Sequence, residues 1–451
     1  MRAVHPFINP KADGGDTTIT RPSDWNATHK AVASISSQSG AYTIVDADNG
    51  KIIRATGSTA QTFTMPAATG LIADWCIWIE NRNTGVGSAS ELAIARASTD
   101  TIDGQTTIYT WPGSLHLLFR TGSGTWESLC LRGGEIEVQS TAGNTLHWPS
   151  NVSRVDFDLL GAGGGGSSGQ KGASGTNRYG GGGGGGGARF FASFAGNALT
   201  ASTALTCTCG TGGMGAATNT GTSTLTGSDG TNSTVSASGL PTLYGFGGSK
   251  GTNAPYGGGG ASMLGSVANQ VYGAPGGNNN AGYSSGTQFR GSAGGGTGQV
   301  FNSNEAESTV WGGAGGGGEP NATISSASGF GGRSIFGGAG GGGGGSISTA
   351  GTAFAGGDGG GTGQQSSYDN NGGGGAAGAT GANGTAGTAG PTLLGPGTGG
   401  GGGGASSAAS GGNGANGGRG CGGGGGGSTN TGAVAGGGGN GGDGLIRIWY
   451  G

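Results

Sequence analysis

Residues 163–175 read GGGGSSGQKGASG, with glycine at every third position from Gly163 to Gly175. The same period returns in residues 375–392, which read GAAGATGANGTAGTAGPT. A period of three matches neither the 3.6 residues of an α-helix nor the alternation of a strand. It matches the polyproline II helix, which has three residues per turn. One side of such a helix carries only glycine, so a neighbouring helix can approach and pair with its unused backbone N–H and C=O groups.

Two other interpretations of the glycine-rich sequence compete with this one. Glycine loses the most backbone entropy on ordering, which favours a flexible chain. A flexible linker has no reason to keep a phase of three, however. Collagen also requires glycine at every third position, but only Pro391 occurs in the triplets of residues 375–392 and no run is long enough for a triple helix. We therefore expect several polyglycine II helices, parallel and antiparallel, packed within one chain.

Composition divides the chain into regions of different character. It has 451 residues and 121 glycines, most of them after residue 150. The region after residue 150 carries equal numbers of basic and acidic residues and has no basic stripe. We therefore expect no nucleic-acid partner and no attraction to anionic membranes. No apolar run reaches 18 residues, and the first 15 residues lack a hydrophobic signal core. These features predict a protein made in the cytoplasm.

The sequence offers little to catalysis or metal binding. The chain has five cysteines, and this odd number predicts free thiols in a reducing compartment. All four histidines precede residue 151, so the glycine-rich region has none to act as base or ligand. Acidic residues are sparse in residues 161–444, where Glu305 and Glu307 are the closest pair. Paired carboxylates would be needed to cleave a polysaccharide. We expect no enzyme activity, no cofactor and no metal.

The sequence predicts a mainly β protein in three parts. Residues 1–39 are polar and punctuated by proline and glycine, which is typical of a disordered tail or a docking arm. Within them, residues 23–34 could start a short helix, and Trp25 favours an arm that docks on a larger assembly.

Residues 40–134 have the pattern of a small antiparallel β-sandwich. Short strands with turn signals recur about every ten residues. Asp48-Asn49-Gly50 predicts a type I′ hairpin between two of these strands. Trp75, Ile77 and Ile79 should share one face of a strand, with Cys76, Trp78 and Glu80 on the other.

Residues 135–451 form the glycine-rich region, framed by two strongly alternating strands near residues 154–160 and 445–450. We expect these strands to pair and close a β core from which the polyglycine II helices extend. Arg447 would then meet Asp156 or Asp158 across the strands.

Candidate binding residues lie in polar segments between the glycine runs. Aromatic side chains among Asn, Ser and Gln are typical of recognition loops. Alternatively, they plug the ends of the bundle as a local core. The candidates are Tyr283, Phe289, Phe301, Trp311, Phe330, Phe336 and Tyr368.

The order of these parts resembles a tailed-bacteriophage tail fibre or receptor-binding protein. The resemblance rests on ITRPSDWNATH near the N-terminus, on residues 42–130, and on the frame formed by HWPSNVSRVDFDLLGAGGGG and GDGLIRIWYG. It implies that the N-terminal arm docks on other tail or baseplate proteins of the virion. It also implies that loops of the glycine-rich part bind an outer-membrane protein or a surface polysaccharide of the bacterium. Fibre proteins of this family are usually homotrimers.

We therefore expect an adhesin of the virion that acts in host attachment. The alternative is a purely structural tail or baseplate appendage without a receptor site of its own.

Overall fold

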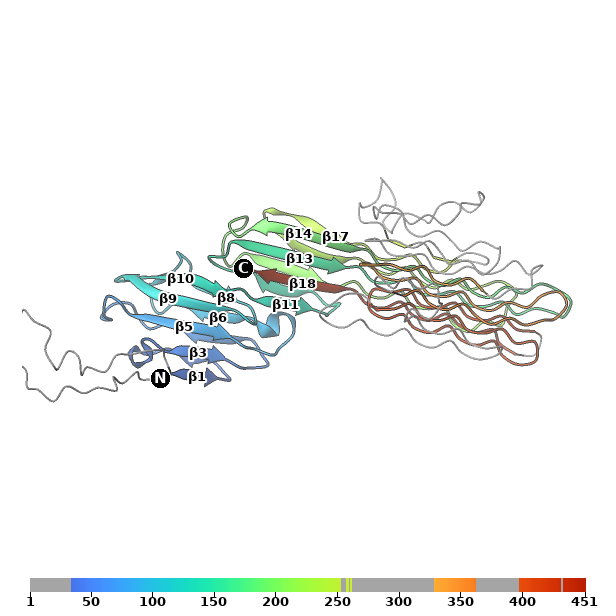
Figure 1. Cartoon of the computed structure of the whole chain (residues 1–451), viewed down its shortest axis with the longest axis horizontal. Helices are drawn as coiled ribbons and strands as arrows, with labels where there is room; N and C mark the ends of the chain where they lie inside the picture. Colours follow the sequence, from blue (N-terminus) through green and yellow to red (C-terminus); the bar gives the residue numbers. More distant parts are fainter. Residues whose placement is uncertain (1–33, 253–256, 259, 262–327, 362–396, 431–432) are drawn as a thin grey trace, which may run out of the picture.

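The computed structural model describes residues 34–252, 257–258, 260–261, 328–361, 397–430 and 433–451. In this part the chain is mainly β, and its helical elements are two 3₁₀ turns, η1 (Asp46–Asp48) and η2 (Gly87–Ser90). The molecule is elongated, with the β-sheets at the N-terminal end and extended glycine-rich segments beyond them (Figure 1). Residues 23–33 of the predicted helix, with the proposed docking residue Trp25, lie outside the described residues.

Two sheets enclose the N-terminal core. The strands of the first sheet, in spatial order, are β1 (Ile35–Gln38), β3 (Ile52–Ala55), β5 (Cys76–Asn81), β9 (Leu115–Gly122), β10 (Thr125–Arg132) and β7 (Thr101–Ile102). Those of the facing sheet are β2 (Tyr42–Thr43), β4 (Gln61–Thr64), β6 (Leu92–Ala95) and β8 (Thr107–Thr110). Trp75, Ile77 and Ile79 are buried in the shared core, as their alternation predicts.

The antiparallel arrangement predicted for this region is wrong for five of its eight strand pairs. Strands β1, β3 and β5 pair in parallel, β7 pairs in parallel with β10, and β2, β4 and β6 do so in the facing sheet. The chain therefore crosses between the layers where a hairpin was expected. The turn η1 carries it from β2 to β3, and Gly50 follows with a φ of 71°. The physical reason is burial of both residues in one core. Ile44 follows β2 of one sheet and Ile53 lies on β3 of the other, and both side chains fill the core between the sheets. A hairpin would put both strands in the same sheet.

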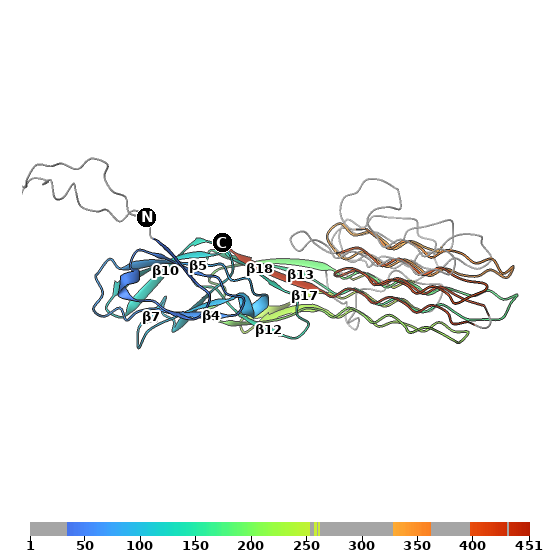
Figure 2. The ribbon, with the colours of Figure 1, turned by 90° about the horizontal axis from the view of Figure 1, so that it is seen from below.

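A second pair of sheets follows along the chain. One has the order β11 (Glu135–Val138), β18 (Leu445–Tyr450), β13 (Arg154–Leu160) and β14 (Arg189–Ala195). The other has the order β12 (Asn144–His147), β15 (Ala204–Thr208), β16 (Ser233–Ala237) and β17 (Leu240–Gly245). Their facing sides share a core that includes Phe157, Leu159, Ile446 and Ile448. Seen from below, β18 and β13 lie in the same layer as β5 and β10, while β4, β12 and β17 lie in the other (Figure 2).

The predicted pairing of the framing strands is confirmed, because β13 and β18 are antiparallel neighbours. Arg447 lies opposite Asp158 in the register of these strands, as predicted, but its ion pair is with a residue on the other neighbour of β18. Its Nε lies 3.2 Å from Oε2 of Glu137 on β11, because β18 has a neighbour on each side. Asp158 instead accepts two hydrogen bonds from Arg189, at 2.7 and 2.6 Å, and Asp156 is held by Arg154 at 2.8 Å.

Beyond the sheets, the glycine-rich segments hydrogen-bond to one another at intervals of three residues. In the segment 420–429, the N–H groups of Gly422 and Gly425 donate to Ala339 and Gly342, each at 2.9 Å. The residues that follow Gly422 bond to other segments: Gly423 donates to Gly164 and Gly424 donates to Ala415. The described neighbours that bond to this segment are residues 164–172, 181–187, 339–345, 400–406, 412–415 and 436–443.

These neighbours run in both directions. Gly423 and Gly426 donate to Gly164 and Ser167 in rising order, so those two segments are parallel. Gly184 donates to Gly423, and Gly181 to Gly426, in the reverse order. Each segment is thus surrounded by backbone groups rather than by side chains.

The close approach of the segments leaves no room for a Cβ atom. Replacing Gly422 with alanine would place Cβ 1.9 Å from the carbonyl oxygen of Gly184. That carbonyl cannot move freely, because it accepts a hydrogen bond from Gly341 at 2.9 Å. We expect Gly422→Ala to lower the unfolding free energy by at least the ~1–3 kcal/mol of an overpacked core, seen as a lower Tm by circular dichroism. Gly143→Ala is the control, because its Cβ would lie 3.5 Å from Thr208 Oγ1. Equal melting of the two variants would contradict this packing.

A buried polar contact joins the two pairs of sheets. Tyr450, near the C-terminus, packs on Trp111 with ring centroids 5.1 Å apart. Its hydroxyl lies 3.2 Å from Nε2 of His116, which is fully buried. Burial lowers the pKa of His116 from 6.5 to about 4. The junction therefore contains a neutral imidazole at neutral pH.

This imidazole makes stability depend on pH. Between about 6.5 and 4 the unfolded chain binds a proton at His116 that the folded chain does not. The unfolding free energy should therefore be highest above this window and fall as the pH is lowered through it, by up to about 3 kcal/mol. His116→Gln keeps a polar side chain without the titration and should lose this part of the pH dependence in denaturant titrations. Identical pH profiles for the two proteins would show that His116 does not titrate as inferred.

Candidate binding surface

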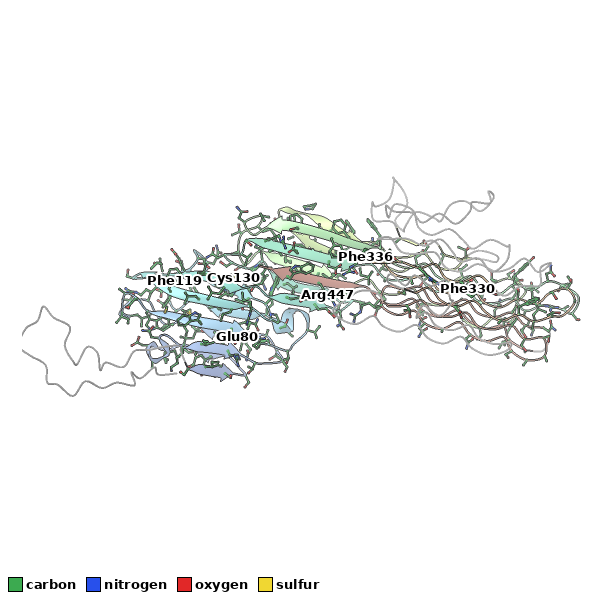
Figure 3. The ribbon with its side chains drawn as sticks, viewed as in Figure 1. Glu80, Phe119, Cys130, Phe330, Phe336 and Arg447 are labelled. Atoms are coloured by element: carbon green, nitrogen blue, oxygen red, sulfur yellow. The ribbon has the colours of Figure 1, made fainter. Side chains whose placement is uncertain are left out.

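Of the aromatic residues predicted to bind, the structure describes Phe330 and Phe336. Both are half-buried; Phe330 lies on an extended segment, and Phe336 lies in the bend that follows it, where the chain turns back. Figure 3 shows Phe336 near the sheets and Phe330 farther along the bundle, so these two rings do not form one surface. The remaining candidates lie outside the described residues: Tyr283, Phe289, Phe301, Trp311 and Tyr368.

Short turns connect the glycine segments at the end of the bundle farthest from the sheets (Figure 1). We call the described ones the distal turns: residues 171–178, 219–224, 346–353 and 406–410. Isolated bridges place them together, because Arg178 pairs with Ile347, and both Lys171 and Ser406 pair with Thr429. Segments far apart in sequence thus form one end surface. Sequence reasoning missed it, although short polar interruptions of the glycine runs, such as KGASGTNR, mark each turn.

Side chains tie the distal turns to one another through the backbone. Asn430 donates from Nδ2 to the carbonyl of Ser407 at 2.8 Å. Asn219 donates to Gly169 at 2.9 Å and accepts from the amide of Gly221 at 2.8 Å. Such Asn contacts fix a turn locally. The end surface is therefore built from ordered polar turns.

Arg178 is the central cation of this surface. It is only 1 % exposed, and its guanidinium donates to Ala173 and to the side chain of Asn430. It thereby joins the first turn to the segment that contains Asn430. Burial lowers the pKa of Arg178, but a guanidinium remains charged at neutral pH. With Lys171 half-buried nearby and no Asp or Glu among the distal turns as defined, this end is basic.

The cysteines of the described residues are free thiols, and residues of the metal-binding types do not cluster. No group of three His, Cys, Asp or Glu in this part is placed to hold a metal ion. All five cysteines are free, as the sequence predicts. Burial raises the pKa of Cys209 and Cys421 to about 12, so neither forms the thiolate that a nucleophile requires. Nδ1 of His147 lies 3.0 Å from Oε2 of Glu91, and its ring stacks on Tyr109. These two contacts hold the imidazole in place.

Comparison with known proteins identifies one region. Residues 139–310 match the family model of a glycine-rich domain. The match begins just before β12 and covers β13 to β17 with the first glycine segments. A search of curated proteins finds no match to the chain. Within the described residues, no helix is long and apolar enough to cross a membrane.

The role of Arg178 can be tested by hydrogen exchange. Arg178→Met keeps the volume and removes the donors, so the amides of residues 172–178 should exchange about ten- to a hundredfold faster, as expected for loss of charged hydrogen bonds. Amides of residues 163–169 should be unchanged. Lys171→Met is the matched control, because the hydrogen bond of Lys171 to Gly221 comes from its backbone. Equal exchange in both variants would mean that the turns hold without the guanidinium.

Proposed function

We propose that this protein is a bacteriophage tail fibre or receptor-binding protein that attaches the virion to a bacterial surface. One observation carries the proposal: an elongated molecule whose β-sheets lie toward the N-terminus and whose polar turns lie at the opposite end. The N-terminal residues 1–39, with Trp25, would dock on the tail or baseplate. The distal turns and the loops between glycine segments would face the host.

The glycine segments would be polyglycine II helices. Support comes from the period of three in their hydrogen bonds and from the carbonyl oxygens that crowd each glycine. A polyproline II helix has this period and leaves its backbone groups free for neighbours. Such a bundle is stiff without a large apolar core, so it would hold variable loops at a fixed distance from the virion. This is the property that an attachment rod requires.

The receptor would be an outer-membrane protein or a surface polysaccharide. Aromatic side chains suit both, because they present large rigid surfaces at low entropic cost. The proposed contacts are Tyr283, Phe289, Phe301, Trp311, Phe330, Phe336 and Tyr368. No catalysis, metal or cofactor enters the proposal, and three copies would form one fibre of the virion.

Competition for adsorption tests the proposal. The purified chain should block adsorption of the phage that carries it, because soluble protein occupies the receptor. Exchanging residues 276–311 and 363–371 for those of a related fibre should abolish the block. Exchanging the loop at 67–73 in the N-terminal part is the control and should leave it intact. If the unaltered, folded chain never reduced adsorption, a purely structural appendage would be the correct assignment.

A further inference from the structure

Three arginines converge on one buried carboxylate at one edge of the six-stranded sheet. Strands β3, β5 and β10 run in the same direction, because β3 and β5 are parallel and β9 is antiparallel to both β5 and β10. Their C-terminal ends therefore meet at one edge, which carries Arg54, Arg82 directly after β5, and Arg132. The residues that alternate with Glu80 along β5 fill the core, so Glu80 lies on the outer face of the sheet (Figure 3). We call these four residues the arginine cluster.

Each arginine uses only part of its guanidinium group to hold Glu80. Arg54 and Arg82 donate from Nε at 2.7 and 2.8 Å, and Arg132 donates from Nη2 at 2.6 Å. In the described part of the chain, the hydrogen bonds of Arg54 and Arg82 engage Nε, which leaves the two terminal nitrogens of each as donors for another acceptor. The three side chains are 33, 51 and 47 % exposed. A ligand from solvent can therefore reach these donors.

The arginine cluster carries an excess of positive charge. Burial by itself raises the pKa of Glu80, but the hydrogen bonds from the arginines bring it down to about 2, so the carboxylate is ionised at neutral pH. Three guanidinium groups and one carboxylate leave a net charge of +2 (3 − 1). Glu135, the next acid along the chain from Arg132, is exposed and forms no ion pair with the described residues. Like charges held this close repel one another, so the cluster favours a second anion.

An indole ring lies beside the arginine cluster. Trp78 precedes Glu80 by two residues on β5, so it is on the same face and about 7 Å away along the strand. Ile52 and Leu117 lie opposite it on the neighbouring strands. Trp78 is half-buried and stacks on no other ring of the described residues. The cluster is thus bordered by an apolar surface that remains partly open to solvent.

We propose that the arginine cluster binds a phosphate group, either as the free ion or as an ester whose organic part lies over Trp78. A phosphate ester has about 1.5 to 2 negative charges at neutral pH and three acceptor oxygens, which match the excess charge and the free donors. A carboxylate brings one charge and two oxygens. Arginine binds phosphate through pairs of parallel hydrogen bonds. The site lies on the N-terminal sheets and goes beyond the proposed function, whose receptor contacts are in the glycine-rich part.

Calorimetric titration of the complete chain at neutral pH and constant ionic strength tests the site. Inorganic phosphate should bind saturably, and acetate should bind at least tenfold more weakly. Arg82→Gln should weaken phosphate binding about tenfold or more, as expected for loss of charged hydrogen bonds, while two arginines still hold Glu80. Arg154→Gln is the matched control, because Arg154 is an exposed arginine paired with the single carboxylate of Asp156. It should leave the affinity for phosphate unchanged.

A second titration distinguishes the two sources of the phosphate group. If an ester is the ligand, glucose 1-phosphate should bind more tightly than inorganic phosphate. Trp78→Leu should then remove this gain without changing the affinity for inorganic phosphate, because the indole contacts only the organic part. Equal affinities of the unaltered chain for the two compounds would identify the free ion as the ligand.

Three results would overturn the proposal. One is the lack of saturable phosphate binding by the unaltered chain. Another is acetate binding as tight as phosphate binding, which would reduce the cluster to a positively charged surface without a site. The third is an unchanged affinity in Arg82→Gln that circular dichroism shows to be folded. Arg54→Gln provides the same test if Arg82→Gln does not fold. Adsorption of the phage does not enter these titrations, so this proposal and the proposed function can fail separately.

Discussion

The backbone hydrogen bond between neighbouring glycine segments is the contact on which the rest of the structure depends. It forms only where two chains approach so closely that a Cβ atom would meet a carbonyl, as at Gly163, where the distance to Cys421 O would be 1.9 Å. Ordering glycine carries a large entropic penalty, which the paired backbone groups offset. Side chains in the bundle are correspondingly small. Ser167 and Ser168 are fully buried, and their hydroxyls bond to the backbone.

The β-sheets set the register in which the glycine segments of the bundle pair. Strands β13 to β18 all continue into glycine segments, so the apolar core around Phe157 and Ile448 anchors those ends. Pairing of β18 with β11 and β13 joins the last residues to the first strands of the region. The contact of Tyr450 with Trp111 and His116 then links this core to the N-terminal sheets. Errors of register at one end would be transmitted along every segment.

Charge is placed where the backbone leaves space for it. In the described bundle, long charged side chains lie at turns, edges and ends, as Arg178 does among the distal turns and Arg419 does beside Glu137 at 3.5 Å. The interior of the bundle excludes them because its segments are separated only by backbone. In such a fold, the side chains that recognise a partner have to lie in the turns and loops that connect the glycine segments.

The sequence by itself determined the β character, the division into a charged part and a glycine-rich part, and the pairing of the two framing strands. Strand alternation and a phase of three are local properties, so they can be read without a structure. The tertiary structure decided the parallel layers of the N-terminal sheets, the ion-pair partner of Arg447 and the assembly of the distal turns. Each of these depends on which segments become neighbours, and glycine runs that are nearly identical do not specify their neighbours. Of the predicted binding residues, the structure places Phe330 on an extended segment and Phe336 in the bend that follows it. The two rings lie apart because spacing along a chain does not fix proximity across a bundle.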